Sequence, residues 1–562
     1  MEEIKSVIEF CSRLLWDTPE VFPIMVLLLL ATGVFLTLQL RLIQFRRLWH
    51  SVLVIAGKYD NPEDAGDVSH FQALSAALSA TVGIGNIAGV ATAVHYGGPG
   101  AVFWLWVTGF IGMATKFTEC TLALKYRKIH PDGSASGGPM YYMRDGLGGN
   151  WGWVGMVFAV CAVISSFGSG NAVQAFTMAD SFRTDFGIPP WISGLVSASL
   201  VAVVILGGIK RIGAVASKLV PFMGLMYVLC ALAVIVLNIE HLPAAISTIV
   251  REAFTPSAGI AGFAGSTFIF TLTWGVKRGL FSNEAGQGSA PIAHAAAKTD
   301  EPVREGAVAL LGPLIDTVVI CAMTGLVVVI TGTWNQRFDD QVNLSPRSSL
   351  TVVSEETKVG VRGTLTDDDK LTGEFVVQEG APVGFKLVRN HSTVEELAIT
   401  FEEKPFGGII VAQAGTIERV IGADGAEASA DSVFAAGKML FNGSPVTAMG
   451  FRVGLQDVMP NGNLLVTFAV FLFALSTAIS WSYYGDRSAE YVFGPKAVLP
   501  YRVIFVIMHF LGAIFSLELV WGFADVALGI MAIPNLFAIL LLSRYVKREA
   551  DDYYRRMGYR GL

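Results

Sequence analysis

Charged residues are scarce in this chain. Asp, Glu, Lys and Arg make up 15% of the 562 residues, whereas a soluble domain has about 25%. Hydrophobic residues make up 53% and gather in repeated long runs. This composition excludes an ordinary soluble domain and predicts an all-α polytopic membrane protein. The charges lie between the apolar runs, so the formal net charge of −6 says little about partners.

Cysteine is also rare, and the five cysteines show neither a metal-ligand spacing nor a disulfide pattern. We interpret them as small core residues. The sequence lacks a phosphate-binding loop, a metal motif and a nucleophile-and-base arrangement, and its eight histidines form no cluster. We therefore do not expect an enzyme, and we expect no nucleic-acid partner.

Many of the apolar runs reach the roughly 20 residues that a transmembrane helix needs. The N-terminus lacks the basic region of a signal peptide, and no cleavage site follows the first run, so we expect a retained helix. Eleven runs are candidates for membrane spans: 21–43, 71–96, 99–125, 151–178, 189–208, 213–238, 260–284, 304–334, 462–483, 500–518 and 520–543.

Lys and Arg cluster after the odd-numbered runs, and the alternate short loops nearly lack them. Positive residues favour the cytoplasmic side of a membrane protein. The pattern predicts a multi-pass protein of the plasma (inner) membrane, in contact with its lipid. Its N-terminus would lie outside and its C-terminus in the cytoplasm.

Residues 336–455 interrupt the apolar pattern. They are polar and lean acidic, and they alternate in strand fashion at 349–353, 358–362, 374–378 and 384–389. We expect a small β-rich insertion outside the cytoplasm, between a first transmembrane part at 1–335 and a second at 456–562. The insertion could cover the outer vestibule, bind an unknown partner or be passive.

The second run contains an unusual polar and glycine-rich stretch. Gly83, Gly85 and Gly89 lie within it, and each interior glycine costs a helix about 0.5–1 kcal/mol relative to alanine. A backbone group freed in hydrocarbon costs several kcal/mol unless protein, ion or water satisfies it. We therefore predict a broken membrane helix whose bare backbone faces a ligand.

The seventh run carries a similar interruption, where Gly275 and Gly279 bracket a Lys-Arg pair. When the first run is set aside, the two interrupted runs are the first and the sixth of ten. Corresponding breaks in two five-helix halves indicate an inverted-repeat transporter with a site at the membrane midplane. The alternative for either run alone is close helix packing through small residues.

Long strings of the chain resemble the alanine or glycine:cation symporter family, the sodium:alanine symporters, a branch of the LeuT-like superfamily. The resemblance covers nearly all the membrane portion and not the insertion. The matching regions are 81–93, 97–101, 168–174, 279–291 and 474–485. It implies a LeuT-like 5+5 inverted repeat preceded by one extra N-terminal helix.

A zwitterionic substrate needs a partner for each of its charges. A broken helix offers free N–H groups at the start of one half and free carbonyls at the end of the other. We expect the turn from Gly83 through Gly85 to Asn86 to bind a carboxylate, with the Thr81 hydroxyl nearby. Carbonyls around Trp274 and Gly275, before Gly279, would accept from an ammonium group.

Gln174 lies in an otherwise apolar run, and its amide can both donate and accept hydrogen bonds. The resemblance implies that Gln174 and Trp274 contact the substrate. Without the resemblance, a hydrogen bond between helices is an equally good explanation for Gln174, and Trp274 would be a packing residue.

Sodium prefers oxygen ligands, as hard cations do. The resemblance implies a sodium site in which the hydroxyls of Ser476 and Thr477 join carbonyls near Ser79 and Val82. Considered alone, the two hydroxyls would bond to their own helix.

Ionisable residues within membrane spans are costly and tend to pair. Glu284 follows Lys277 and Arg278, so we considered a cytoplasmic gate formed by these residues. The alternative is an interfacial charge in water. Asp316 is a candidate proton relay, Glu119 and Asp525 are further buried acids to weigh, and we placed His294 at the cytoplasmic surface.

The leading hypothesis is a secondary active symporter that imports alanine or glycine with Na⁺ by alternating access. Two alternatives stay open: an H⁺-coupled or other LeuT-like small-solute transporter, and a transporter-like receptor that senses its ligand through the insertion. A channel would need a continuous polar pore lining, which these runs lack.

Overall fold

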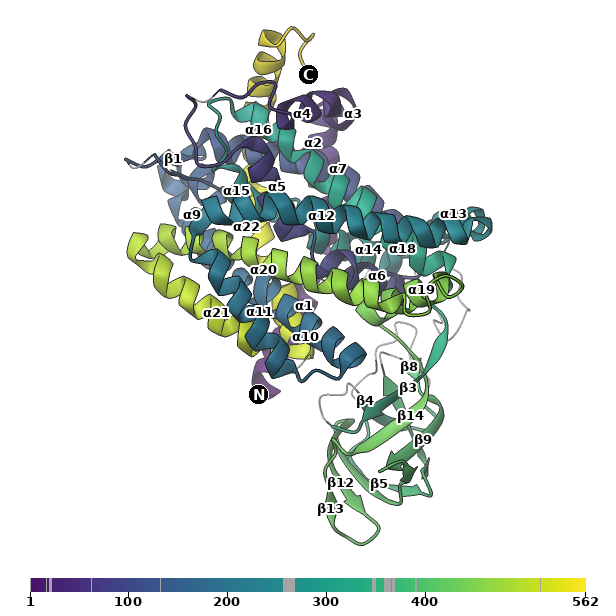
Figure 1. The fold of residues 1–562 in the computed structure, drawn as a ribbon. Helices are drawn as coiled ribbons and strands as arrows, with labels where there is room; N and C mark the ends of the chain where they lie inside the picture. The colour runs from purple at the N-terminus through teal and green to yellow at the C-terminus, as the bar shows by residue number, and fades with distance from the viewer. Residues whose placement is uncertain are drawn as a thin grey trace.

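A computed structural model describes residues 2–16, 18–19, 23–61, 63–131, 133–255, 268–345, 350–357, 365, 369–389, 392–515 and 517–562. Figure 1 shows a bundle of helices from one end of which a separate β-rich region projects, next to α18 (Ala322–Ile330) and α19 (Ser444–Gly454). The expected combination of an all-α membrane part and a β-rich region is confirmed.

The helices of the first half follow one another with short connections. Their bounds are α1 (Glu2–Trp16), α2 (Ile24–Gln39), α3 (Ile43–Arg46), α4 (Leu48–Ile55), α5 (His70–Thr81), η1 (Ile84–Asn86), α6 (Ala88–Gly97), α7 (Gly100–Lys125), α8 (Pro139–Tyr141), η2 (Tyr142–Gly146), η3 (Gly149–Trp151), α9 (Gly152–Phe167), η4 (Gly168–Ala172), α10 (Val173–Phe186), α11 (Pro190–Ile205) and α12 (Gly208–Leu237). A two-stranded ribbon of β1 (Lys128–Ile129) and β2 (Ala135–Ser136) follows α7.

The second half begins after η5 (Ile239–His241) and α13 (Leu242–Phe254). Besides α18 and α19, it contains α14 (Phe268–Asn283), α15 (Ala290–His294), α16 (Pro302–Ala309), α17 (Leu311–Pro313), η6 (Leu314–Cys321), α20 (Asn463–Phe493), η8 (Pro495–Ala497), α21 (Val498–Ile514) and α22 (Leu517–Arg556).

Among the described residues, seven helical segments are long and apolar enough to cross a membrane. They become eight if α5 and α6, which meet at a bend of 60°, count as one span. Of the other three predicted spans, 21–43 and 189–208 contain the shorter apolar helices α2 and α11. The third, 260–284, lies partly outside the described residues. The chain is therefore a multi-pass membrane protein.

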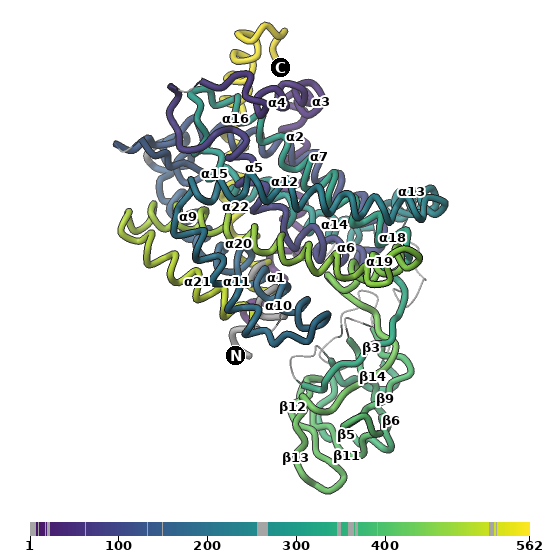
Figure 2. The backbone as a smooth tube through the Cα atoms, viewed as in Figure 1, coloured from purple at the N-terminus to yellow at the C-terminus, as the bar shows by residue number. Residues whose placement is uncertain are grey.

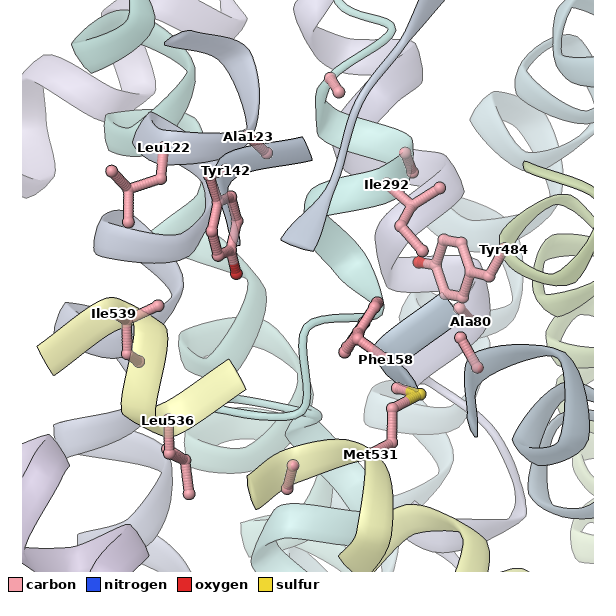
Figure 3. Close-up of a cluster of buried hydrophobic side chains, with 14 of the residues drawn as sticks. Ala80, Leu122, Ala123, Tyr142, Phe158, Ile292, Tyr484, Met531, Leu536 and Ile539 are labelled. Carbon is pink, nitrogen blue, oxygen red and sulfur yellow. The ribbon is translucent and has the colours of Figure 1, made fainter. Parts of the chain in front are cut away.

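The membrane core is continuous across the two halves. Figure 3 shows side chains from α5, α7, α9, α15, α20 and α22 meeting in one apolar cluster, among them Ala80, Phe158, Tyr484 and Met531. Phe158, Tyr484 and Met531 are at most 1% exposed. Because both halves contribute, the helix breaks at the centre are held by a shared, close-packed interior.

The β-rich region forms two antiparallel sheets, which Figure 2 shows well separated from the helix bundle. One sheet has the order β10-β9-β14-β3 and the other β6-β5-β11-β12-β4-β7-β8, with β13 paired to β12. Their bounds are β3 (Arg337–Asn343), β4 (Leu350–Ser354), β5 (Gly373–Gln378), β6 (Ala381–Pro382), β7 (Phe385–Arg389), β8 (Ser392–Thr393), β9 (Glu395–Phe401), β10 (Lys404–Pro405), β11 (Gly408–Gln413), β12 (Thr416–Gly422), β13 (Glu427–Ala428) and β14 (Val433–Leu440).

The strands predicted at 349–353, 374–378 and 384–389 correspond to β4, β5 and β7, and the one at 358–362 lies outside the described residues. The region has its own core, which includes Val352, Leu387 and Ile410. The boundaries 336 and 455 remain a prediction.

The second helix break lies elsewhere than we predicted. α14 runs without interruption from Phe268 to Asn283, past Gly275 and Gly279. The chain leaves helical geometry only at Glu284, Gly286 and Gly288, which have φ angles of +56°, +89° and +85°. The helix resumes as α15 at Ala290.

Gly275 and Gly279 instead allow α14 and α7 to pack closely. A Cβ atom on Gly275 would lie 2.6 Å from the Ala101 carbonyl oxygen, and one on Gly279 would lie 2.9 Å from Thr108 Cβ. Small residues four apart commonly serve this purpose in membrane helices. The packing alternative is therefore correct for this pair, and the prediction of freed carbonyls at Trp274 and Gly275 is wrong.

A buried carboxylate ties three helices together at the end of the bundle opposite α13. Glu305 on α16 is hydrogen-bonded to His70 Nδ1 at the start of α5 and, at 2.5 Å, to His294 Nδ1 on α15. All three side chains are at most 2% exposed. His294 is thus buried in a cluster, and its predicted surface position is wrong.

We expect Gly275→Ala to destabilise the protein by about 1–3 kcal/mol, because the new methyl group would clash with the α7 backbone. Gly312→Ala is the matched control, since a Cβ atom there meets nothing within 4 Å. Thermal unfolding of the purified protein in detergent measures both. An unchanged unfolding midpoint for Gly275→Ala would contradict the packing role.

Candidate functional site

Local sequence sets the start of α5, the helix that leads into the first break. Ser69 begins α5 with a capping box, in which its side chain accepts from the Gln72 N–H and Gln72 Oε1 accepts from the Ser69 N–H. The helix ends at Thr81, and the single turn η1 leads into α6. The predicted broken helix at Gly83 to Asn86 is confirmed.

Side chains satisfy the backbone groups that the break exposes. The Gly83 N–H donates to Asn86 Oδ1 at 2.9 Å, and the Ile84 N–H donates to Gln174 Oε1 over a long 3.4 Å. The Asn86 carbonyl accepts from Thr324 Oγ1 at 2.7 Å. Asn86 belongs to the break itself, whereas Gln174 and Thr324 come from α10 and α18, so local sequence and the surrounding fold together hold the break.

Asn86 points away from the open side of the break. Its Nδ2 donates to Asp316 Oδ1 at 2.6 Å and to Ser282 Oγ at 3.1 Å. Asp316 Oδ2 also accepts from the hydroxyls of Ser282 and Thr317, each at 2.7 Å. Asn86 therefore holds the backbone of the break through hydrogen bonds within the protein, and it is not among the residues that line the cleft. Its predicted contact with a substrate stays a prediction.

A small cleft lies on the open side of the break and contains about 250 Å³ of empty space. Its wall combines α5, the break, η4, α10, α14, α20 and α22. The lining residues are Ala80, Thr81, Gly83, Gly85, Ser169, Gln174, Phe281, Glu284, Thr477, Trp481 and Leu528.

The cleft brings together four of the eight substrate residues expected from the sequence: Thr81, Gly83, Gly85 and Gln174. The others lie outside its lining. Trp274 stacks on Tyr96 with a ring separation of 4.3 Å, while Gly275 and Gly279 pack on α7. Trp274 lies more than two turns before the end of α14, and it is therefore distant from the second break, which begins at Glu284.

The four residues expected to bind sodium lie together beside the cleft. Thr477 Oγ1 is 3.1 Å from the Ser79 carbonyl oxygen and 3.5 Å from that of Val82. Ser476 Oγ lies 3.4 Å from the same Ser79 oxygen. These oxygens are neutral, buried and contributed by two helices, which fits a hard monovalent cation.

Sequence reasoning missed several lining residues. Phe281, Trp481 and Leu528 have no feature that separates them from packing residues in a sequence. Glu284 was noted, but for a gate with Lys277 and Arg278. It lines the cleft instead, and its oxygens accept from Trp481 Nε1 at 2.8 Å and from Ser289 Oγ. The signal for its position was the run of glycines that follows it.

Lys277 and Arg278 pair with Asp525 on α22. Lys277 Nζ is 2.8 Å from Asp525 Oδ2, and Arg278 Nη1 is 3.5 Å from Asp525 Oδ1. Lys277 and Arg278 thus pair with an intramembrane acid, as expected, but the acid is Asp525. The prediction that it is Glu284 is wrong. The ion pair joins α14 to α22.

Comparison with known proteins gives a consistent result. A model of the sodium:alanine symporter family matches residues 1–361 and 432–560. The sodium/alanine symporter AgcS of Methanococcus maripaludis is 39% identical over 550 residues, which cover 98% of this chain and 97% of that protein. YrbD of Bacillus subtilis, whose name describes a sodium/proton-dependent alanine carrier, is 32% identical over 549 residues, 97% of this chain and 91% of that protein.

A solved structure shares the fold. The crystal structure of MhsT in complex with L-phenylalanine superposes with a TM-score of 0.50 at 12% sequence identity. The match covers 87% of this chain and 93% of that chain. The expected LeuT-like arrangement is therefore confirmed at the level of the fold.

We expect Gly83→Ala to abolish sodium-dependent ligand binding, because a Cβ atom there would lie 2.5 Å from Thr477 Oγ1 and 3.3 Å from Gln174 Oε1. Gly89→Ala, six residues further on, is the matched control, because its Cβ atom would meet only Arg278 Cδ at 3.9 Å. Binding of radiolabelled alanine to the purified variants, with and without sodium, tests this. Wild-type binding by Gly83→Ala would contradict the close approach.

Proposed function

Because this chain belongs to the sodium:alanine symporter family, and is thus a cation-coupled amino-acid symporter and not an enzyme, we propose that it imports alanine or glycine together with Na⁺. Thr81, Gly83, Gly85 and Gln174 would face the amino acid. Ser79, Val82, Ser476 and Thr477 would hold the ion.

One observation carries this proposal: Thr477 belongs to both sites. Its side chain lines the cleft and also touches the carbonyls of Ser79 and Val82. A cation drawn to those carbonyls would fix the Thr477 hydroxyl and the end of α5. The wall of the amino-acid cleft would then be set by the ion, which gives each ligand a means of raising the affinity for the other.

The size of the cleft supports a small substrate. Phe281, Trp481 and Leu528 line it with large side chains, which leave little room for a ligand. A methyl or hydrogen side chain fits such a space better than a long one. The Ile84 N–H, which now donates a long hydrogen bond to Gln174, would donate to a substrate carboxylate instead.

Transport would proceed by alternating access around this cleft. The Asp525 pair with Lys277 and Arg278 joins α14 to α22 on one side, and the cluster of His70, Glu305 and His294 joins α5, α15 and α16 on the other. We propose that these contacts open in turn. From the distribution of Lys and Arg, the C-terminus would be cytoplasmic, and the N-terminus and the β-rich region outside.

We expect purified protein in liposomes to concentrate labelled alanine when sodium is higher outside than inside. Uptake without a sodium gradient should only equilibrate. Concentrative uptake driven by a proton gradient alone would favour the H⁺-coupled alternative. Ligand binding without any uptake would favour the receptor alternative, and deletion of residues 336–450 would then test the β-rich region directly.

We expect Thr477→Val to raise the sodium concentration for half-maximal alanine uptake at least about tenfold, since one lost oxygen ligand costs about 1.4 kcal/mol or more. Ser482→Ala on the same helix is the control, because its hydroxyl donates to the Ile479 carbonyl of its own turn. An equal sodium response in both variants would remove Thr477 from the ion site.

A further inference from the structure

Glu284 is the acidic residue that lines the cleft. It ends α14, where its N–H still bonds to the Leu280 carbonyl, and its φ angle of +56° turns the chain into the second break. A left-handed conformation is uncommon for a residue with a side chain, and such strained positions cluster at functional sites. The side chain is 2% exposed, so its carboxylate is removed from bulk water.

Two donors fix the carboxylate in place. Trp481 Nε1, from α20, donates to Oε1 at 2.8 Å, and Ser289 Oγ, from the end of the second break, donates to Oε2. Each carboxylate oxygen can accept two hydrogen bonds. The group therefore keeps accepting capacity that none of these contacts uses, and it does so at the wall of the cleft.

The charge of Glu284 is not matched by an ion pair among the residues that the structure describes. The buried Lys116 acts on it electrostatically but also acts on Glu119 and Asp316. Lys277 and Arg278 are engaged by Asp525. A buried carboxylate without a counter-charge costs several kcal/mol, so a cation brought by the ligand would be strongly favoured.

Glu119 and Asp316 are not placed to bind a cationic group of a ligand in the cleft. Glu119 Oε1 accepts from Asn535 while its Oε2 has no hydrogen-bond partner among the described residues, and Asp316 accepts from Asn86, Ser282 and Thr317. Neither lines the cleft. Of the three carboxylates that share Lys116, Glu284 is the one that faces the ligand.

We propose that the Glu284 carboxylate binds the ammonium group of the substrate and thereby selects amino acids over carboxylates that lack an amine. The proposal rests on the function proposed above, and it names the residue that binds the positive charge of the zwitterionic substrate. It places the substrate between the first break, whose N–H groups suit a carboxylate, and the second break, whose first residue supplies a carboxylate. The neutral oxygens around Thr477 are left to the ion.

The experiment compares alanine with L-lactate, which has a hydroxyl in place of the ammonium group and is otherwise nearly identical. Competition of each against labelled alanine, at saturating sodium, gives both affinities for the wild type and for Glu284→Gln. Glutamine keeps an acceptor for Trp481 and a partner for Ser289 but has no charge. Loss of one charged hydrogen bond corresponds to roughly 10–100-fold in affinity.

We expect the wild type to prefer alanine over lactate by at least about 10-fold and Glu284→Gln to lose most of that preference, because its alanine affinity falls while its lactate affinity does not. Glu119→Gln is the control for a buried carboxylate outside the cleft and should keep the preference. Glu284→Asp retains the charge and should restore part of it.

Equal losses for both ligands in Glu284→Gln would overturn the proposal, because that pattern indicates a merely structural role. An unchanged preference would also overturn it and would indicate a protonated Glu284. If the variants fail to fold, the wild type still decides, since comparable binding of lactate and alanine excludes an ammonium partner. Failure of wild-type alanine binding in sodium would instead count against the proposed function itself.

Discussion

The rest of this structure depends on one constraint: a helix broken inside an apolar bundle must find partners for every backbone group it frees. The first break meets this constraint with the side chain of its own Asn86 and with side chains from two other helices, α10 and α18. Asn86 accepts from Gly83, Gln174 from Ile84, and Thr324 donates to the Asn86 carbonyl. These partners position the backbone, and the cleft is the space that they leave open.

The first break could be predicted because its signal is local: three glycines in one membrane span weaken a helix wherever it lies. The oxygens beside it were expected only from the family resemblance, because a pair of hydroxyls considered alone would bond to its own helix. The second break was misplaced because a glycine has two uses. Gly275 and Gly279 provide close helix packing, whereas Gly286 and Gly288 provide positive φ angles. Spacing alone does not separate these uses.

The pairing of buried charges could not be predicted, because it joins residues far apart in the sequence. Lys277 meets Asp525, Glu305 meets His70, and Glu119 meets Asn535. Each contact depends on how complete helices pack, and the packing follows from the whole apolar core. A charge in a membrane span thus signals that a partner exists without indicating which one. Glu284 shows the same limit, since its donor Trp481 is distant in sequence, whereas the nearby Lys277 and Arg278 pair with Asp525.

The position of Thr477 has an evolutionary consequence. One hydroxyl contacts the carbonyls of Ser79 and Val82 and also forms part of the cleft wall. Under the proposed function, a substitution there would alter ion preference and amino-acid preference together. Descendants of this protein would change substrate more readily at Phe281 or Leu528, which line the cleft without contacting those carbonyls. Within such a lineage, the transported amino acid should therefore change rapidly and the coupling ion slowly.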